Sequence, residues 1–271
     1  MPKFVIFSDL DGTLLDHETY SFQAAAEALD LLRSKNIPLI LCTSKTRKEI
    51  ELYRKLLDNN FPFISENGGG IYIPEDYFSI DFDYDKKIDG YKVIELGTPR
   101  KELSDILKSI SDNTGIQLRK FSEMSLSEIE ELTGLKEEIA KLAMERDYSE
   151  PFVIQEEDKN IATIEKEINL KGYMHTKGGR FHHILGRNDK GKAVIILTNI
   201  YKSEFDDIKT VGIGDSLNDL PMLQSVDIPI IVQKPNGSYE PEIKLSNLIY
   251  ADGIGPSGWN SSILKQFMNF D

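Results

Sequence analysis

The chain has 271 residues, an ordinary globular composition and a formal net charge of −13. The length suits one large or two modest domains, and the acidic balance argues against a nucleic-acid partner because phosphate backbones require a basic surface. The single cysteine, Cys42, excludes an internal disulfide framework, and no apolar run approaches the roughly 20 residues that span a bilayer. We therefore expect a cytoplasmic protein without a membrane partner.

Short apolar runs alternate with amphipathic segments along the first part of the chain. The apolar runs predict strands at 4–7, 37–42 and 61–65, and the periodic segments between them predict helices at 21–35 and 45–58. This alternation is typical of a parallel, doubly wound sheet.

The pattern changes in the middle of the chain and returns near its end. The middle reads as a connector, four helices and four strands, at 80–90, 91–96, 99–113, 125–132, 135–146, 151–155, 160–169 and 172–185. The last part reads as helices and strands again, at 191–201, 210–214, 220–226, 228–232, 248–251 and 261–270. The predicted fold is α/β: a doubly wound, Rossmann-like core (1–82 and 188–271) with an inserted α+β cap domain (83–187).

Carboxylates follow the ends of two predicted core strands. Asp9 and Asp11 come after the first strand, and Asp215 follows the strand at 210–214. Ligands of such sheets bind beyond the carboxyl ends of the strands, and oxygen-rich sites suit Mg²⁺. The alternative readings are an Asx turn at Asp9 and a capped helix start at Asp215. Nothing favours zinc, because Cys42 is alone and two adjacent histidines on one strand face opposite ways.

Lys190 stands immediately before a predicted helix. At that position its ammonium group is able to bind a phosphate, and the positive end of the helix dipole adds to the attraction. The alternative is a solvated surface lysine.

The ordered set of motifs resembles the haloacid dehalogenase superfamily of phosphatases. The set is Asp9-Leu-Asp11-Gly-Thr-Leu, Thr43, Lys190-Gly191 and Gly214-Asp215-Ser-Leu-Asn-Asp219. The insertion between the second and third motifs is similar to a large α/β cap. Segments 65–70, 146–152 and 180–186 resemble the mannosyl-3-phosphoglycerate phosphatases and the related glucosyl enzymes. Thr43-Ser44-Lys45 departs from the Thr-Gly-Arg common in sugar-phosphate phosphatases.

The resemblance implies a role for each core motif. Asp9 is the nucleophile that forms an aspartyl-phosphate, and Asp11 protonates the leaving alkoxide and then activates water. Thr43 and Lys190 hold the phosphoryl oxygens. Asp9, the main-chain carbonyl of Asp11, and Asp215 bind Mg²⁺, while Asp219 ligates through water or orients Lys190.

Substrate binding is expected from residues near the core motifs and in the cap. Arg side chains match planar anions, glycines let the backbone approach a ligand, and Glu accepts from sugar hydroxyls. The expected set is Ser44, Lys45, Glu66, Asn67, Gly68, Gly69, Arg146, Ser149, Glu150, Lys177, Gly178, Arg180, Asn218 and Asp219. The alternative for each is a hairpin glycine or a surface ion pair. His182 is expected to pack rather than to react.

The implied function is a Mg²⁺-dependent phosphatase with a small phosphorylated sugar as substrate. It hydrolyses mannosyl-3-phosphoglycerate or glucosyl-3-phosphoglycerate and leaves the glycosylglycerate, a compatible solute. A sugar-phosphate phosphatase or phosphomutase of the same superfamily, and a ligand-binding module without catalysis, are the alternatives. The choice of sugar depends on a few hydrogen bonds in the cap, and the oligomeric state stays open.

Overall fold

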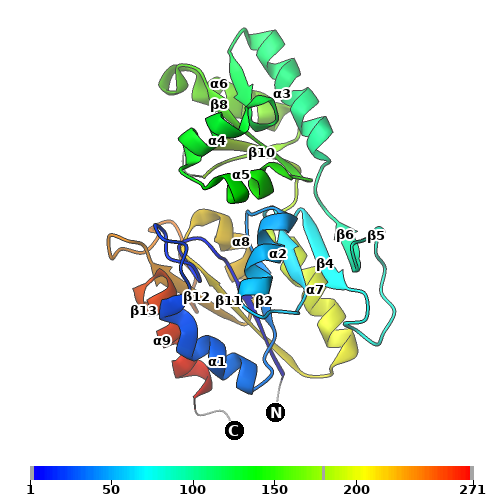
Figure 1. Cartoon of the computed structure of the whole chain (residues 1–271), viewed down its shortest axis with the longest axis vertical. Helices are drawn as coiled ribbons and strands as arrows, with labels where there is room; N and C mark the ends of the chain where they lie inside the picture. The colour runs from blue at the N-terminus through cyan, green and yellow to red at the C-terminus, as the bar shows by residue number, and fades with distance from the viewer. Residues whose placement is uncertain (1–2, 179–180, 269–271) are drawn as a thin grey trace.

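The computed structural model describes residues 3–178 and 181–268. It consists of a core built on a large sheet and a cap on top of it (Figure 1). The strands of the large sheet are β1 (Lys3–Ser8), β2 (Leu39–Cys42), β3 (Phe63–Ser65), β4 (Gly70–Pro74), β5 (Lys86–Ile88), β6 (Tyr91–Glu95), β11 (Ile208–Gly214), β12 (Ile228–Gln233) and β13 (Ile249–Ile254). The core helices are α1 (Ala26–Ser34), α2 (Arg47–Leu56), α7 (Lys190–Glu204), α8 (Leu220–Gln224) and α9 (Gly255–Phe267), with short 3-10 turns at Gln23–Ala25 and Leu217–Asp219.

Within the described residues, the large sheet has the order β13-β12-β11-β1-β2-β3-β4-β6-β5. The strands from β13 to β3 are parallel, and β4, β6 and β5 extend the sheet antiparallel. Strand β1 pairs with both β2 and β11, so Asp9 and Asp215 emerge at the same edge of the sheet. This confirms the predicted α/β fold.

Helices cover both faces of the sheet, which explains why β1 reads as a continuous apolar run. Phe4 and Ile6 pack in one cluster with α1, α2 and α9, while Val5 and Phe7 pack in a second cluster with α7 and α8. Successive side chains of a strand point to opposite faces, so a strand buried on both sides must be apolar throughout.

The cap is a smaller antiparallel sheet with helices on it. Its strands are β7 (Leu118–Lys120), β8 (Ser149–Ile154), β9 (Met174–Gly178) and β10 (Phe181–Leu185), and its helices are α3 (Arg100–Thr114), α4 (Leu126–Thr133), α5 (Glu137–Met144) and α6 (Glu157–Leu170), with a 3-10 turn at Phe121–Glu123. The strand order is β7-β8-β10-β9. Helices α3 and α6 pack on one face of this sheet, and α4 and α5 lie on the side toward the core (Figure 1).

Several predicted boundaries need correction. Strands β5 and β6 pair in the large sheet, so the predicted cap boundary at residue 83 falls before two core strands. Strand β4, at Gly70–Pro74, is missing from the predicted elements, and β5 lies inside the predicted connector. Helix α2 begins at Arg47 because Thr46 and Glu49 form a reciprocal N-terminal cap, which leaves Lys45 outside the helix.

None of the helices in the described part of the chain combines the length and the hydropathy that crossing a bilayer requires.

Candidate active site

Three aspartates converge at the carboxyl end of β1 and β11. One oxygen from each of Asp9, Asp215 and Asp219 lies within 4.8 Å of the others. Asp9 follows β1 directly, and its backbone N–H bonds the carbonyl of Ile213 at 3.0 Å, which ties the two strand ends together. The cluster is largely buried, with Asp9 only 4% exposed.

Lys190 is a buried partner of this cluster. Its Nζ donates to Asp9 Oδ1 and to Asp219 Oδ1, both at 2.6 Å. Burial opposes the charge of Lys190, but the neighbouring carboxylates of Asp219 and Asp9 outweigh it and keep its pKa above the ordinary value. The bond to Asp219 is compatible with one of the two roles expected for that residue, and the surface alternative for Lys190 is wrong because the residue is fully buried.

Asp215 is held in place by the first motif. Thr13 Oγ1 donates to Asp215 Oδ1 at 3.1 Å, and Gly12, at φ +75°, lies against the same carboxylate. A Cβ on residue 12 would stand 3.1 Å from Asp215 Oδ2, so the glycine permits both the turn and the close approach. Asp219 Oδ2 also accepts from the backbone N–H of Asp215 at 3.0 Å.

The negative charge of this cluster is not fully neutralised by Lys190, which fits the binding of a divalent cation. Burial, followed by the charge of Asp219, raises the pKa of Asp215 to about 6, and burial also raises the pKa of Asp9. One lysine does not neutralise three neighbouring carboxylates, and hard oxygen donors of this kind are the ligands that Mg²⁺ prefers.

The carboxylate of Asp11 is not part of the three-aspartate cluster, although it lines the same cavity as Asp9. Its Oδ2 pairs with Lys45 Nζ at 2.9 Å, and Glu49 lies 3.6 Å from the same Nζ. Lys45 is 6% exposed, and its pKa stays above the ordinary value because Asp11 and Glu49 outweigh the effect of burial. Lys45 therefore holds the side chain of Asp11 at the cavity wall.

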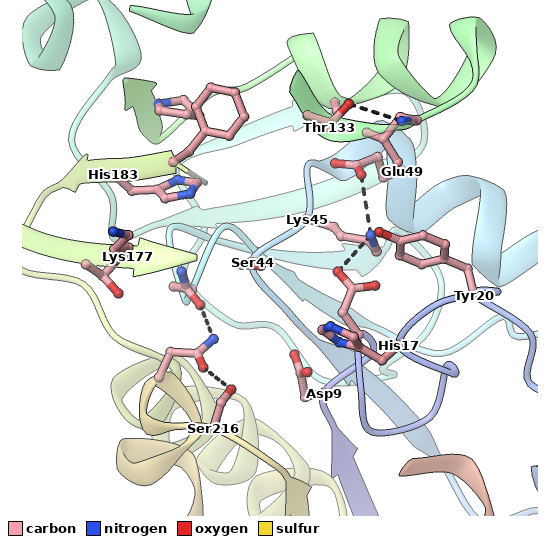
Figure 2. A pocket seen from close by; sticks show the side chains of 18 of the residues that line it. Asp9, His17, Tyr20, Ser44, Lys45, Glu49, Thr133, Lys177, His183 and Ser216 are labelled. Atoms are coloured by element: carbon pink, nitrogen blue, oxygen red, sulfur yellow. Dashed lines mark hydrogen bonds and ion pairs between the residues drawn. The ribbon is translucent and has the colours of Figure 1, made fainter. Parts of the chain in front are cut away.

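These groups face a cavity of about 830 Å³ between core and cap. Figure 2 shows Asp9 at the bottom of this space and His183 at its upper left, with Lys177 on the left and Lys45 on the right. Of the expected binding residues, the cavity is lined by Asp9, Asp11, Ser44, Lys45, Asn67, Arg146, Lys177, Asp215 and Asn218. Residues from both parts of the protein therefore share one site.

Other expected binding residues lie behind the cavity wall. Thr43 is buried at the end of β2, where its Oγ1 accepts from the N–H of Lys45 at 3.4 Å. Glu150 is fully buried and accepts from Arg100 Nε at 2.7 Å and from the N–H of Ser122 at 2.9 Å, so its oxygens serve the cap. Gly178 ends β9, and Arg180 lies outside the described residues.

Glu66 and Ser149, which were expected to bind substrate, bond to each other across the core–cap boundary. The carboxylate of Glu66 accepts from the N–H groups of Asp147 and Tyr148 and from Ser149 Oγ, at 2.7, 3.1 and 2.5 Å. Burial raises the pKa of Glu66 in spite of the charge of Arg146. Both residues join core to cap and leave no oxygen for a sugar.

Gly68 and Gly69 serve close packing rather than ligand approach. A Cβ on residue 68 would stand 2.2 Å from the carbonyl oxygen of Asp189, and one on residue 69 would stand 2.5 Å from Tyr148 Cβ. The turn after β3 therefore fits tightly against the start of α7 and against the cap.

Several lining residues escaped the sequence analysis. His183 and Phe181 both line the cavity from β10, and Lys234 and Tyr20 line it from loops. Alternation along β10 gives the signal for the first pair, since residues 181 and 183 share a face while His182 packs against His175 on the other. Burial, and then the charge of Arg146, lowers the pKa of His183 to about 3, so its ring is neutral at ordinary pH.

Comparisons with known proteins agree with this geometry. A family model described as haloacid dehalogenase-like hydrolase matches residues 6–240. A protein of Methanococcoides burtonii named "Glucosyl-3-phosphoglycerate/mannosyl-3-phosphoglycerate phosphatase" is 50% identical over 97% of this chain and 96% of its own length. A protein of Persephonella marina with the same name is 43% identical, over 96% of both chains.

A solved structure supports the fold. The haloacid dehalogenase-like hydrolase from Bacteroides thetaiotaomicron superposes with a TM-score of 0.70 at 18% identity, covering 98% of this chain and 100% of that one. The resemblance drawn from the motifs is confirmed, and the chain belongs to the haloacid dehalogenase-like hydrolases.

Proposed function

We propose that this protein is a Mg²⁺-dependent phosphatase of mannosyl-3-phosphoglycerate or glucosyl-3-phosphoglycerate. The observation that carries the proposal is the 50% identity, over 97% of the chain, to a relative named for both activities. The presence of Asp9 and Asp215 at a cavity large enough for a phosphorylated molecule of disaccharide size, with Lys190 bonded to Asp9 behind them, supports it. A cytoplasmic location remains part of the proposal.

The metal would be held by Asp9, Asp215 and the main-chain carbonyl of Asp11, with Asp219 beside them. When bound, Mg²⁺ offsets the repulsion between these carboxylates and the phosphate of the substrate. Lys190 then has two tasks: its charge opposes the effect of burial on the pKa of Asp9, and together with the hydroxyl of Thr43 at the end of β2 it stabilises charge on the phosphoryl oxygens.

The reaction proceeds by covalent catalysis. A carboxylate oxygen of Asp9 attacks phosphorus, the bond to the glycerate oxygen breaks, and Asp11 gives its proton to the leaving alkoxide. Asp11 then takes a proton from water, which attacks the aspartyl-phosphate and releases phosphate. Lys45 keeps the Asp11 carboxylate at the cavity wall, where both proton transfers have to take place.

Substrate recognition falls to residues of the cavity wall. The substrate carries a carboxylate, and the guanidinium of Arg146 is its natural partner because the fork of N–H donors matches a planar anion. Lys177, Ser44 and Asn218 line the same space and are left for the phosphate and the sugar. The neutral ring of His183 suits a hydroxyl group, since it both donates and accepts.

A substrate panel tests the proposal. Phosphate release is measured with both glycosyl-3-phosphoglycerates and with hexose phosphates, each with Mg²⁺ and with excess chelator. We expect turnover of at least one glycosyl-3-phosphoglycerate that depends on Mg²⁺. Absence of such turnover rejects the proposal, and transfer of phosphate to another sugar hydroxyl, seen by product analysis, identifies a phosphomutase.

A further inference from the structure

We propose that Glu66 is a positioning residue for substrate recognition: from the core, it orients Arg146 of the cap toward the carboxylate of the substrate. This inference rests on the proposed function and deepens it, because it assigns the reading of the carboxylate to a pair of residues on opposite sides of the core–cap boundary.

The first observation is the way Glu66 holds the cap. Its Oε1 accepts from the N–H of Asp147 at 2.7 Å, and its Oε2 accepts from the N–H of Tyr148 at 3.1 Å and from Ser149 Oγ at 2.5 Å. Three donors thus converge on one buried carboxylate. Only a side chain in which both terminal atoms accept hydrogen bonds satisfies all three. These donors belong to the three residues that directly follow Arg146.

The second observation links this clamp to the guanidinium. Arg146 Nη1 donates to Ser149 Oγ at 3.0 Å and to the carbonyl of Ser44 at 3.3 Å, and it lies 4.0 Å from Glu66 Oε2. Ser149 therefore connects Glu66 to Arg146 through one hydroxyl, which donates to the carboxylate and accepts from the guanidinium.

The third observation is that the donor set of Arg146 is incomplete. Its side chain is 10% exposed and lines the cavity, and its Nε is buried without a hydrogen-bond partner among the described residues. A buried charged group with an unpaired donor is costly, and because the side chain lines the cavity, an anion bound there is its natural partner. A carboxylate is able to accept from two N–H groups of one guanidinium at once.

The backbone of the clamp is itself immobilised. Glu66 stands at φ +46°, a conformation unusual for a residue with a side chain, and its N–H bonds the carbonyl of Lys45 at 3.0 Å. Asn188, in the connection from cap to core, donates to the carbonyl of Glu66 at 3.3 Å. The carboxylate thus starts from a fixed point of the core.

Replacing Glu66 with Gln tests the inference. The amide has one acceptor and one NH₂ group, so an N–H of the cap segment must face another donor. We expect the KM for the glycosyl-3-phosphoglycerate to rise about 10-fold or more, the scale of one charge-assisted hydrogen bond, while kcat changes much less. The matched control is Glu95→Gln, which removes the negative charge of the acceptor of Tyr148 Oη, at 2.5 Å on the far side of the same segment, and does not touch Arg146.

A double-mutant cycle separates positioning from general damage. If Glu66 acts through Arg146, the KM effect of Glu66→Gln disappears in an Arg146→Met background. Additive effects, or an equal loss in Glu95→Gln, overturn the inference. Ser149→Ala, a smaller change that breaks only the hydroxyl link, provides a second variant if Glu66→Gln fails to fold, and it is expected to raise KM in the same direction.

Inhibition distinguishes failure of this inference from failure of the proposed function. With p-nitrophenyl phosphate as the reporter substrate, we measure inhibition by 3-phosphoglycerate and by glycerol 3-phosphate, which lacks the carboxylate. We expect the wild-type protein to prefer 3-phosphoglycerate and Glu66→Gln to lose that preference. A wild-type protein without the preference, or a variant that keeps it, overturns the inference even if glycosylated substrates are turned over. Absence of that turnover with the preference present rejects only the proposed function.

Discussion

Lys190 Nζ lies 2.6 Å from a carboxylate oxygen of Asp9 and 2.6 Å from one of Asp219, and none of these groups has more than slight contact with solvent. The lysine therefore belongs both to the reaction and to the stability of the core. Removing one partner of a buried ion pair leaves the other charge uncompensated, which is far more costly than losing a surface pair.

Lys190→Met is expected to abolish phosphatase activity and to lower the free energy of unfolding by about 3–5 kcal/mol. Urea denaturation followed by circular dichroism measures the second effect. Lys192→Met is the control, since Lys192 lies on the same helix with its side chain 55% exposed and is expected to change stability by less than about 0.5 kcal/mol. Equal behaviour of the two variants would contradict a buried role for Lys190.

Asp9→Asn is expected to lower kcat by at least about 10³-fold, because the amide is not a nucleophile toward phosphorus. Its stability is expected to fall less than that of Lys190→Met, because Asp219 still pairs with Lys190 at 2.6 Å when Asp9 has lost its charge. Brief incubation with substrate followed by acid quench and mass spectrometry is expected to show an added phosphoryl group on the wild-type protein alone. An Asp9→Asn protein with normal turnover would point to another nucleophile.

Lys45→Met is expected to lower the kcat of two kinds of substrate to different extents. Without Lys45, the carboxylate of Asp11 loses its partner at 2.9 Å and no longer stays at the cavity wall. General acid catalysis contributes ~10²–10⁴-fold, so kcat for a glycosyl-3-phosphoglycerate is expected to fall on that scale. p-Nitrophenyl phosphate has a leaving group that needs no proton and is expected to lose much less. Equal losses with both substrates would exclude a role through Asp11, and Lys45→Arg is expected to preserve part of the activity.

Magnesium affinity is expected to fall as the pH drops below about 6. The pKa of Asp215 is raised to about 6 by burial and by Asp219, so below this pH the folded protein without metal holds a proton on that carboxylate. Mg²⁺ binds the deprotonated form and must displace the proton, which weakens apparent affinity as the pH falls and shifts the acidic limb of activity to lower pH when Mg²⁺ is increased. Titration calorimetry from pH 5 to pH 8 measures this dependence. A Mg²⁺ affinity that does not change between pH 5 and pH 7 would place the metal away from Asp215.

The meeting of Asp9 and Asp215 was predictable because the carboxyl ends of parallel strands share one edge of a sheet. The sequence pattern did not reveal that the carboxylate of Asp11 pairs with Lys45. This pairing depends on the start of α2, where Thr46 and Glu49 cap the N-terminus of the helix and leave Lys45 outside it, at the cavity.

Glu66, Glu150 and Arg146 show where the sequence stops being informative. All three are charged residues in recognisable segments, yet only Arg146 lines the cavity. Glu150 is used inside the cap and Glu66 across the boundary, because each meets donors from residues distant in the chain. Strand β5, with its two lysines, was missed for a related reason: an edge strand needs little apolar character, so its pattern resembles a loop.

Tyr148 adds a packing contact to the two chain segments that connect core and cap. Its ring fills a socket that extra carbon atoms at Gly69, Gly70 or Gly97 would obstruct, at 2.5–2.8 Å. The cap is thus held to the core by this packing as well as by the chain and by the hydrogen bonds to Glu66. A substitution at Tyr148, which does not line the cavity, is therefore expected to loosen the core–cap contact and to change the rate of any step that requires the cap to move.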